Sequence, residues 1–394
     1  MRLGDGDGIY RIDLCDQPAQ VDAQAWNALL SRQAQPTPFL LHQNLLALHD
    51  SGSATPETGW APLFFLVHEG SHLVAGAVSY LKTHSYGEYV FDWAWADAYR
   101  QHGLRYYPKL LAAAPFTPVP GSRLLADHPA ARQALAQAMR RFVVSQKLSS
   151  AHVLFIDDED RQALQADGWM LRQNVQFHWQ QDSAAPLTSF EALLAAMSHD
   201  KRKRIRQERR KVHDAGVEFQ VLEGAAITER HWDFFHHCYT RTYAAHHSTP
   251  YLSRDYFARL QATMAEHWLM FTARREGRPI AASLIAIDRP RRQAWGRYWG
   301  SVEHVPCLHF EACYYQPLAW CIAEGFLRFE GGAQGEHKMA RGLLPVATSS
   351  AHWLRDPRFA SAVADFVARE GAGIERYVDE LREHSPFKAD PAQR

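Results

Sequence analysis

The sequence of 394 residues has no excess of charge of either sign, because 43 lysines and arginines balance 43 aspartates and glutamates. A neutral chain has no long-range field that would draw it to nucleic acid or to a membrane surface, so any such partner must meet a local patch. Hydrophobic residues make up 46% and charged residues 22% of the chain, which is typical of a globular protein and excludes a disordered or coiled-coil one. The length predicts two or three domains.

Long apolar segments and a secretory signal are also missing. The uncharged stretch at residues 110–122 contains three prolines and is too short to span a bilayer. The first twenty residues include Asp5, Asp7, Asp13 and Asp16 and lack the basic and apolar regions of a secretory signal. We therefore expect no transmembrane segment and a cytoplasmic location.

The sequence has few cysteines and no recognisable metal-binding spacing. Its five cysteines form an odd set without a Cys-x-x-Cys pair, which argues against a disulfide framework and against a zinc site. Among the 22 histidines, the pairs at 236–237 and 246–247 are not accompanied by a His-Glu-x-x-His spacing. We expect reduced thiols, ordinary histidines and no bound metal.

An internal repeat is the most informative feature that is present. Residues 8–14 align with 216–222, and residues 63–70 align with 269–277, at offsets of about 207. Two shorter matches follow, 91–93 with 298–300 and 106–107 with 314–315. In the second copy, apolar runs at 268–275 and 279–287 flank a glycine turn, which predicts a hairpin. Mixed helices and strands of this kind predict an α/β fold with mixed sheets and helices on their faces. The predicted domains are residues 1–180 and 216–394, joined by a linker and basic helical connector at 181–215.

The connector contains the strongest local charge in the sequence. Residues 201–211 hold eight basic residues and one acid, and on a helix this charge spreads around most of the circumference. Such a helix can contact the phosphates of a tRNA, of a nucleotide-linked precursor or of membrane lipid, and sequence-specific nucleic-acid binding is not expected. The alternative is a solvated connector helix neutralised by neighbouring acids. The candidate phosphate-binding residues are Lys201, Arg202, Lys203, Arg204 and Arg206.

Several motifs resemble a known family. The motifs at residues 91–93 (Phe-Asp-Trp, expected as a strand) and 106–110 (Tyr-Tyr-Pro-Lys-Leu), and the segment 329–346 followed by 350–353, are similar to those of FemAB-like proteins, which are labelled peptidoglycan biosynthesis or recognition proteins. The duplicated hairpin, aromatic strand and helix resemble tandem GNAT acyltransferase domains. The resemblance covers nearly the whole chain and implies two tandem GNAT-like domains.

This resemblance implies acyl or aminoacyl transfer to an amine, plausibly that of a peptidoglycan precursor or a peptide. It implies no prosthetic group but requires an activated donor, either aminoacyl-tRNA or acyl-CoA. Neither half carries the glycine-rich loop that cradles the pyrophosphate of coenzyme A, which favours a Fem-type donor or an unusual acyl donor. The alternative function is a module that has lost catalysis and binds a peptidoglycan precursor or a peptide.

The candidate catalytic residues lie in the second copy. Attack of an amine on an ester or thioester builds negative charge that a cation can stabilise, and Lys338 is the strongest candidate for that role. Glu336 or His337 can accept the proton that the amine loses. The glycines at 331, 332 and 335 predict an interrupted strand, on which Glu336 and Lys338 point to one side and His337 to the other. The alternatives are a solvated polar strand end and, for the glycines, a simple turn.

Aromatic side chains with polar tips suit a peptide or sugar-peptide acceptor, and charged residues among them are difficult to place in a core without a partner. The core is the alternative for at least half of the aromatic ones. The candidate substrate-binding residues are Arg341, Trp353, His352, Tyr298, Trp299, Glu311, Tyr314, Asp92, Trp93, Tyr106, Tyr107 and Lys109.

Overall fold

The computed structural model describes residues 2–4, 9–332 and 335–388. Gly8 of the repeat and Ala333 and Gln334 of the family segment lie outside the described residues. The chain divides into two compact units: unit 1 comprises Met1–Asn174 and Ala347–Arg376, and unit 2 comprises Val175–Val346 and Tyr377–Arg394. The chain therefore passes between the units within β8 (Met170–Gln180), within β14 (Leu344–Leu354) and within α12 (Pro357–Glu383).

In unit 1, the strands follow the order β1-β2-β3-β4-β5-β7-β14, and β6 pairs with β4. All neighbours are antiparallel except β5 and β7, which are parallel. The tight β3–β4 turn follows from Gly70, whose positive φ suits glycine. The strands are β1 (Arg2–Gly4), β2 (Arg11–Cys15), β3 (Trp60–Glu69), β4 (His72–Lys82), β5 (Lys109–Ala112), β6 (Leu125–Ala126) and β7 (Ser150–Ile156).

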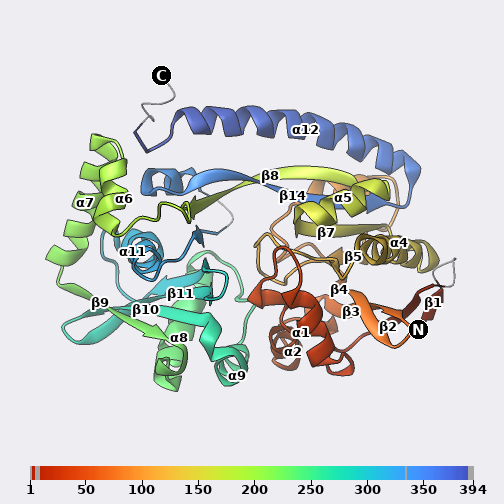
Figure 1. The fold of residues 1–394 in the computed structure, drawn as a ribbon, viewed down its shortest axis with the longest axis horizontal. Helices are drawn as coiled ribbons and strands as arrows, with labels where there is room; N and C mark the ends of the chain where they lie inside the picture. The colour runs from red at the N-terminus through yellow and green to blue at the C-terminus, as the bar shows by residue number, and fades with distance from the viewer. Residues whose placement is uncertain (1, 5–8, 333–334, 389–394) are drawn as a thin grey trace. The chain divides into compact units, whose positions relative to one another are not determined.

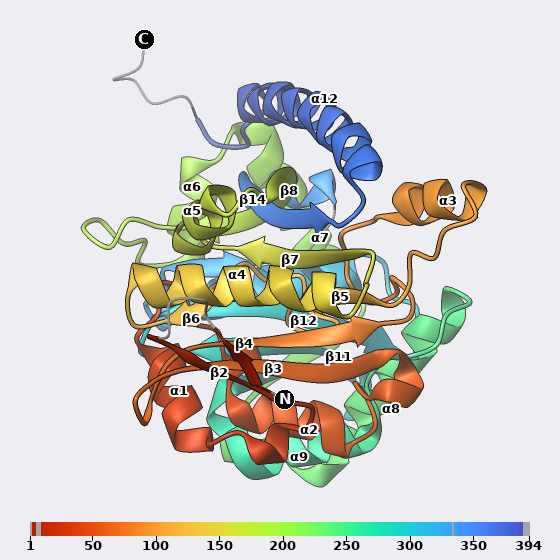
Figure 2. The same ribbon diagram turned by 90° about the vertical axis from the view of Figure 1, so that its right-hand side faces the viewer.

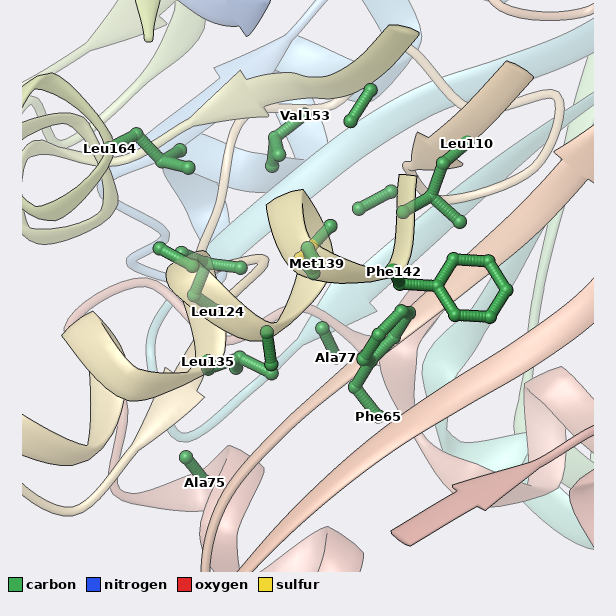
Figure 3. Close-up of a cluster of buried hydrophobic side chains, with 14 of the residues drawn as sticks. Phe65, Ala75, Ala77, Leu110, Leu124, Leu135, Met139, Phe142, Val153 and Leu164 are labelled. Carbon is green, nitrogen blue, oxygen red and sulfur yellow. The ribbon is translucent and has the colours of Figure 1, made fainter. Parts of the chain in front are cut away.

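Helices cover both faces of this sheet. Successive residues of β3 point to opposite faces, so Phe64 meets Trp26 of α1 while Phe65 meets Phe142 of α4, each pair with ring centroids 5.5 Å apart. The α4 side chains form the core with β3, β4, β5 and β7, as Figure 3 shows around Met139. Figure 2 shows α4 lying along the sheet. The helices of unit 1 are α1 (Ala23–Ser31), α2 (His42–Asp50), α3 (Trp93–Gln101), α4 (Pro129–Ser145) and α5 (Asp158–Ala166).

In unit 2, the strands follow the order β9-β10-β11-β12-β13-β8, with parallel pairing only between β12 and β13. The predicted hairpin is present, and both Glu276 and Gly277 in its turn have positive φ, as a two-residue hairpin turn requires. The strands are β9 (Val217–Glu223), β10 (Trp268–Arg275), β11 (Arg278–Asp288), β12 (Gln293–Ser301) and β13 (Arg328–Glu330).

The helices of unit 2 include one unusual segment. Residues Glu311–Tyr315 form a π-helix between α10 and α11, and the Ser283 hydroxyl of β11 fixes it by donating to the Ala312 carbonyl at 2.6 Å. A π-helical turn places successive side chains differently from an α-helix and is frequent at functional sites. The α-helices are α6 (Phe190–Ala196), α7 (His199–Asp214), α8 (Glu229–Ala245), α9 (Arg254–Met264), α10 (Leu308–Phe310) and α11 (Gln316–Ala323) (Figure 1).

The same strand pattern occurs twice, which confirms the predicted fold class of mixed sheets with helices in two tandem GNAT-like units. The order β2-β3-β4-β5-β7-β14 in unit 1 matches β9-β10-β11-β12-β13-β8 in unit 2, including the single parallel pair. Two of the proposed sequence matches were wrong. Residues 91–93 do not form a strand, because Trp93 begins α3 and Asp92 is its N-cap, and the counterpart of β12 is β5. Residues 106–107 precede β5, whereas residues 314–315 follow β12.

The observed division differs from the predicted domain limits in two respects. Residues 347–376 group with unit 1, because β14 pairs with β7 from Ser349 to Leu354. The segment 181–215, expected as a connector between domains, belongs to unit 2 with α6 and α7.

Candidate functional site

Lys338 lies in a short helical turn and not in the predicted strand. Residues Glu336–Arg341 form a 3-10 helix, preceded by Gly335 and followed by Gly342, both with positive φ. Glycine tolerates a positive φ, so the chain can turn at these two positions after β13, and the extended conformation ends there. The predicted alternation of Glu336, His337 and Lys338 across a strand is therefore wrong.

The Lys338 side chain is buried, with 3% of its surface exposed. Its Nζ donates a hydrogen bond to the carbonyl oxygen of Gly332 at 2.8 Å, and no carboxylate pairs with it among the described residues. A Cβ at Gly331 would lie 2.5 Å from Leu343 Cδ2 and 3.3 Å from Lys338 Cδ, so glycine makes room for the lysine. Burial lowers the pKa of Lys338 to about 8.

The two neighbours of Lys338 proposed as bases differ in their surroundings. His337 lies with its Nε2 3.2 Å from the hydroxyl of Tyr314. Burial and the nearby charges of Arg341 and Lys338 lower the pKa of His337, which favours the neutral imidazole. Glu336 and His337 are both exposed, and Glu336 accepts a hydrogen bond from Tyr377.

Arg341 is held by a carboxylate that the sequence analysis missed. Its guanidinium donates to both oxygens of Glu208, at 3.2 and 3.0 Å, and the hydroxyl of Tyr315 donates to the same carboxylate. The Arg341 guanidinium also lies over the ring of Phe310, 3.5 Å from its centroid. Glu208 is the single acid within the basic run 201–211, and this isolation is the signal by which the sequence could have revealed it.

The π-helix orients three side chains of the candidate site in different directions. Tyr314 points to His337, whereas Tyr315 reaches Glu208 on α7. Glu311 is buried and pairs with Arg209 of α7 at 3.0 Å, and it also accepts from Gln316 at 2.7 Å. Of the two predicted substrate-binding residues here, Tyr314 lies beside His337, while Glu311 anchors α7.

The basic residues of α7 line hollows on its exposed sides. A groove of about 620 Å³, called the reaction groove below, is lined by Asp200, Lys203, Arg204, Gln207, Glu208, Lys211, Cys307 and Phe310. Arg202 and Arg206, together with Lys203, line a second hollow of about 730 Å³. Arg204 and Arg206 are paired with Glu208 and Glu191, at 3.1 and 2.7 Å. Lys201 is half-buried and lines neither hollow.

Seven of the predicted residues lie in unit 1, and the exposed one, Trp93, is described separately below. Lys109 is fully buried and pairs with Glu88 at 2.7 Å and with Asp92. Tyr106 donates to Asp92 at 2.6 Å. Burial would raise the pKa of Asp92, but the Lys109 charge outweighs it and holds that pKa below its usual range. Tyr107 contacts Ser85 at 2.8 Å, and His352 and Trp353 lie on the part of β14 that belongs to unit 1.

This buried network continues through two histidines. The hydroxyl of Tyr106 lies 3.2 Å from His152 Nε2, and His152 Nδ1 lies 2.8 Å from His352 Nδ1. Asp92, Tyr106, Lys109 and His352 are all buried, and their mutual contacts fix the polypeptide around them. The sequence analysis missed Glu88 and His152, which no motif distinguishes.

Three predicted aromatic residues have different environments. Trp93 is 39% exposed, and its ring lies 5.1 Å from that of Tyr86. Tyr298 packs against Tyr239 of α8 at 5.3 Å and belongs to the aromatic core, which agrees with the alternative considered above. Trp299, on the opposite face of β12, lies 5.1 Å from His309, whose ring is 5.7 Å from Tyr314.

Two properties of the described residues restrict the kinds of site that they contain. No helix among them is long and apolar enough to cross a membrane. Within the same residues, no group of three or more His, Cys, Asp or Glu side chains is arranged to hold a metal ion.

The structure is similar to several solved proteins. L-PGS from Bacillus licheniformis is 11% identical with a TM-score of 0.55, and the match covers 90% of this chain and 98% of that one. FemX is 9% identical with a TM-score of 0.53, covering 89% and 100%. A conserved protein from Bacteroides thetaiotaomicron is 9% identical with a TM-score of 0.54, covering 87% and 100%. At these identities the likeness shows the fold alone.

No sequence among the curated proteins matches this chain. A family model matches residues 17–389, nearly the whole length, and its description is peptidoglycan biosynthesis/recognition. The family expected from the motifs at residues 91–93, 106–110 and 329–353 is thereby confirmed. The chain belongs to the FemAB_like family.

Proposed function

We propose that this protein is an N-acyltransferase or aminoacyltransferase, which forms an amide on an amine acceptor in unit 2. The observation that carries the proposal is the environment of Lys338, a buried cation whose Nζ has only a backbone carbonyl as partner among the described residues. A buried charge without an anion is costly, and it becomes useful when a reaction supplies negative charge beside it.

The reaction begins with attack of the acceptor nitrogen on the carbonyl carbon of the donor, which forms the C–N bond and places negative charge on the carbonyl oxygen. Lys338 stabilises that oxygen through the free N–H groups of its ammonium. The nitrogen then loses a proton to neutral His337, whose Nε2 lies beside the Tyr314 hydroxyl. Collapse of the intermediate breaks the bond to the leaving oxygen or sulfur, which takes the proton from His337.

The reaction groove fits the phosphate-bearing part of the donor. Lys203 and Lys211 line it without a carboxylate partner among the described residues, and Phe310 also lines it. The Phe310 ring lies under Arg341 and 6.0 Å from the ring of His337. A donor bound by its phosphates in this groove therefore extends toward His337. Aminoacyl-tRNA and acyl-CoA both carry such phosphates, and contact with phosphates needs no base readout.

The acceptor class follows from the family and from the aromatic side chains near the site. The family description, peptidoglycan biosynthesis/recognition, favours a peptidoglycan precursor or a peptide with a free amine. Trp299, His309 and Tyr314 form a continuous row of rings that ends at His337. Aromatic faces with polar edges suit such a peptide.

The test compares Lys338→Met with wild type in transfer of a radiolabelled acyl group. Aminoacyl-tRNA and acetyl-CoA are offered as donors, and a peptidoglycan-precursor pentapeptide with a free amine is the acceptor. We expect turnover to fall by about 10²–10³, as loss of one donor to an oxyanion does. Lys147→Met, at an exposed position of unit 1, is the control and retains turnover.

Melting curves establish that each variant is folded before activity is compared. Wild-type turnover in a folded Lys338→Met protein would remove Lys338 from the mechanism. Binding of the pentapeptide by wild type without any transfer from either donor would favour the alternative, a non-catalytic module for a peptidoglycan precursor or a peptide.

A further inference from the structure

A third hollow lies on α7, and the proposed reaction does not use it. It has a volume of about 540 Å³, and none of the residues that line it also line the reaction groove. This rear cavity is within the size range of sites for small molecules. It is lined by Glu191, Leu194, Arg206, Arg209, Arg210, Val212, His213, Val217, Phe219, Glu311 and Gln316.

One part of the rear cavity is apolar. Leu194, Val212 and Val217 are buried, and Phe219 of β9 is half-buried beside them. These side chains come from α6, α7 and β9, so the apolar surface depends on how three elements pack and not on a single stripe of one helix. Such a surface favours a ligand that has an apolar chain or ring.

The charged part of the rear cavity has one cation in excess. Three arginines and two glutamates line it, which leaves a formal charge of +1. Arg206 pairs with Glu191 at 2.7 Å, and Arg209 pairs with Glu311 at 3.0 Å. Arg210 has no carboxylate partner among the described residues. A guanidinium that is free at the rim of an apolar cavity is complementary to a single anionic group.

We propose that the rear cavity binds a small anionic amphiphile, with its carboxylate or phosphate on Arg210 and its apolar portion on Val212, Val217 and Phe219. The ligand is a free small molecule, because the cavity volume and its single excess charge fit one such molecule. The rear cavity shares no lining residue with the reaction groove, although Glu191, Arg206 and Arg210 also line the hollow of about 730 Å³.

Binding of octyl phosphate to the full chain tests the proposal by isothermal titration. Inorganic phosphate and octyl glucoside serve as head-only and tail-only probes. We expect octyl phosphate to bind at least tenfold more tightly than inorganic phosphate or octyl glucoside, because the charged and the apolar parts of the cavity both contribute. Arg210→Gln weakens its binding about tenfold, as loss of a charge-assisted contact does. Phe219→Ala also weakens the binding of octyl phosphate but leaves the binding of inorganic phosphate unchanged.

Two matched variants separate this site from the reaction groove. Lys201→Gln removes a charge from α7 at a position that lines none of the three hollows, and Lys211→Gln changes a residue that lines the reaction groove alone. Neither should change the affinity for octyl phosphate. Equal binding of octyl phosphate and inorganic phosphate, or equal weakening by Lys211→Gln and Arg210→Gln, would overturn the proposal. Binding to anionic phospholipid vesicles that Arg210→Gln abolishes would replace the small molecule with a membrane surface.

Discussion

Acidification should destabilise unit 1 through the buried histidine pair on β7 and β14. His152 and His352 are both about 1% exposed, and their Nδ1 atoms lie 2.8 Å apart. Burial, together with the charges of Lys109 and Arg172, lowers the pKa of His152 from 6.5 to about 3, against the opposing effect of Asp92. Burial likewise holds the pKa of His352 well below its usual range.

The sign follows from the difference between the folded and unfolded proteins. The unfolded chain binds a proton at each histidine near its ordinary pKa, while the folded protein does not, so protons favour unfolding. Stability is fully present above pH 6.5 and is lost as the pH falls from 6.5 toward 3. For His152 alone the free energy of unfolding decreases by about 2 kcal/mol between pH 7 and pH 5, and His352 adds to this loss.

Urea unfolding at pH 7, 6 and 5, followed by circular dichroism, measures this slope. His152→Gln and His352→Gln should each take up about one proton fewer on unfolding. The free energy of unfolding should therefore change with pH by about 1.4 kcal/mol per pH unit less than in wild type. Each variant also loses hydrogen bonds at pH 7, so the slope and not the stability itself is the readout. His72→Gln, at an exposed position of β4, retains the wild-type slope. The same slope in both buried variants and in wild type would refute the reasoning.

Three further outcomes follow from the geometry of unit 2. Glu208→Gln should lower the free energy of urea unfolding by about 1–3 kcal/mol, because a buried carboxylate with charged partners is lost, whereas exposed Glu218→Gln should leave it unchanged. Gly331→Ala should lower turnover and melting temperature because its Cβ would contact neighbouring side chains, whereas Gly371→Ala, in open space on α12, should raise the melting temperature. Lys203→Gln should reduce the salt dependence of aminoacyl-tRNA binding, measured by filter binding at several salt concentrations; an unchanged slope would exclude this lysine from phosphate contact.

Periodicity and turn residues were sufficient to predict the parts of the fold that depend on local sequence. The hairpin around Glu276 and Gly277 was predicted to within a residue, because a turn with positive φ restricts which residues can occupy it. The matches that failed, at residues 91–93 and 106–107, compared aromatic residues whose role depends on what lies beside them. Aromatic identity alone does not distinguish a strand from the start of a helix.

The site residues were harder to predict because their roles depend on contacts between distant segments. Lys338 and Lys109 are both lysines in family motifs, yet Lys109 is neutralised by Glu88 and Asp92, while Lys338 has, among the residues that the structure describes, only the Gly332 carbonyl as partner. Glu208 was hidden within a basic run, since the sequence does not show that its carboxylate turns inward to Arg341. Local sequence identified the chemical groups, and only packing determined which of them have partners.

The passage of the chain between units within β8 and β14 constrains how a nascent polypeptide can mature. Unit 1 takes its last strand from residues 349–354. During synthesis, β7 therefore remains an unpaired sheet edge until those residues have been made. Unit 2 takes β8 from a strand that begins in unit 1, and β8 is synthesised well before its partner β13. Neither half is a complete folding module, and a gene cut between residues 180 and 216 should yield two fragments that fold only when they are expressed together.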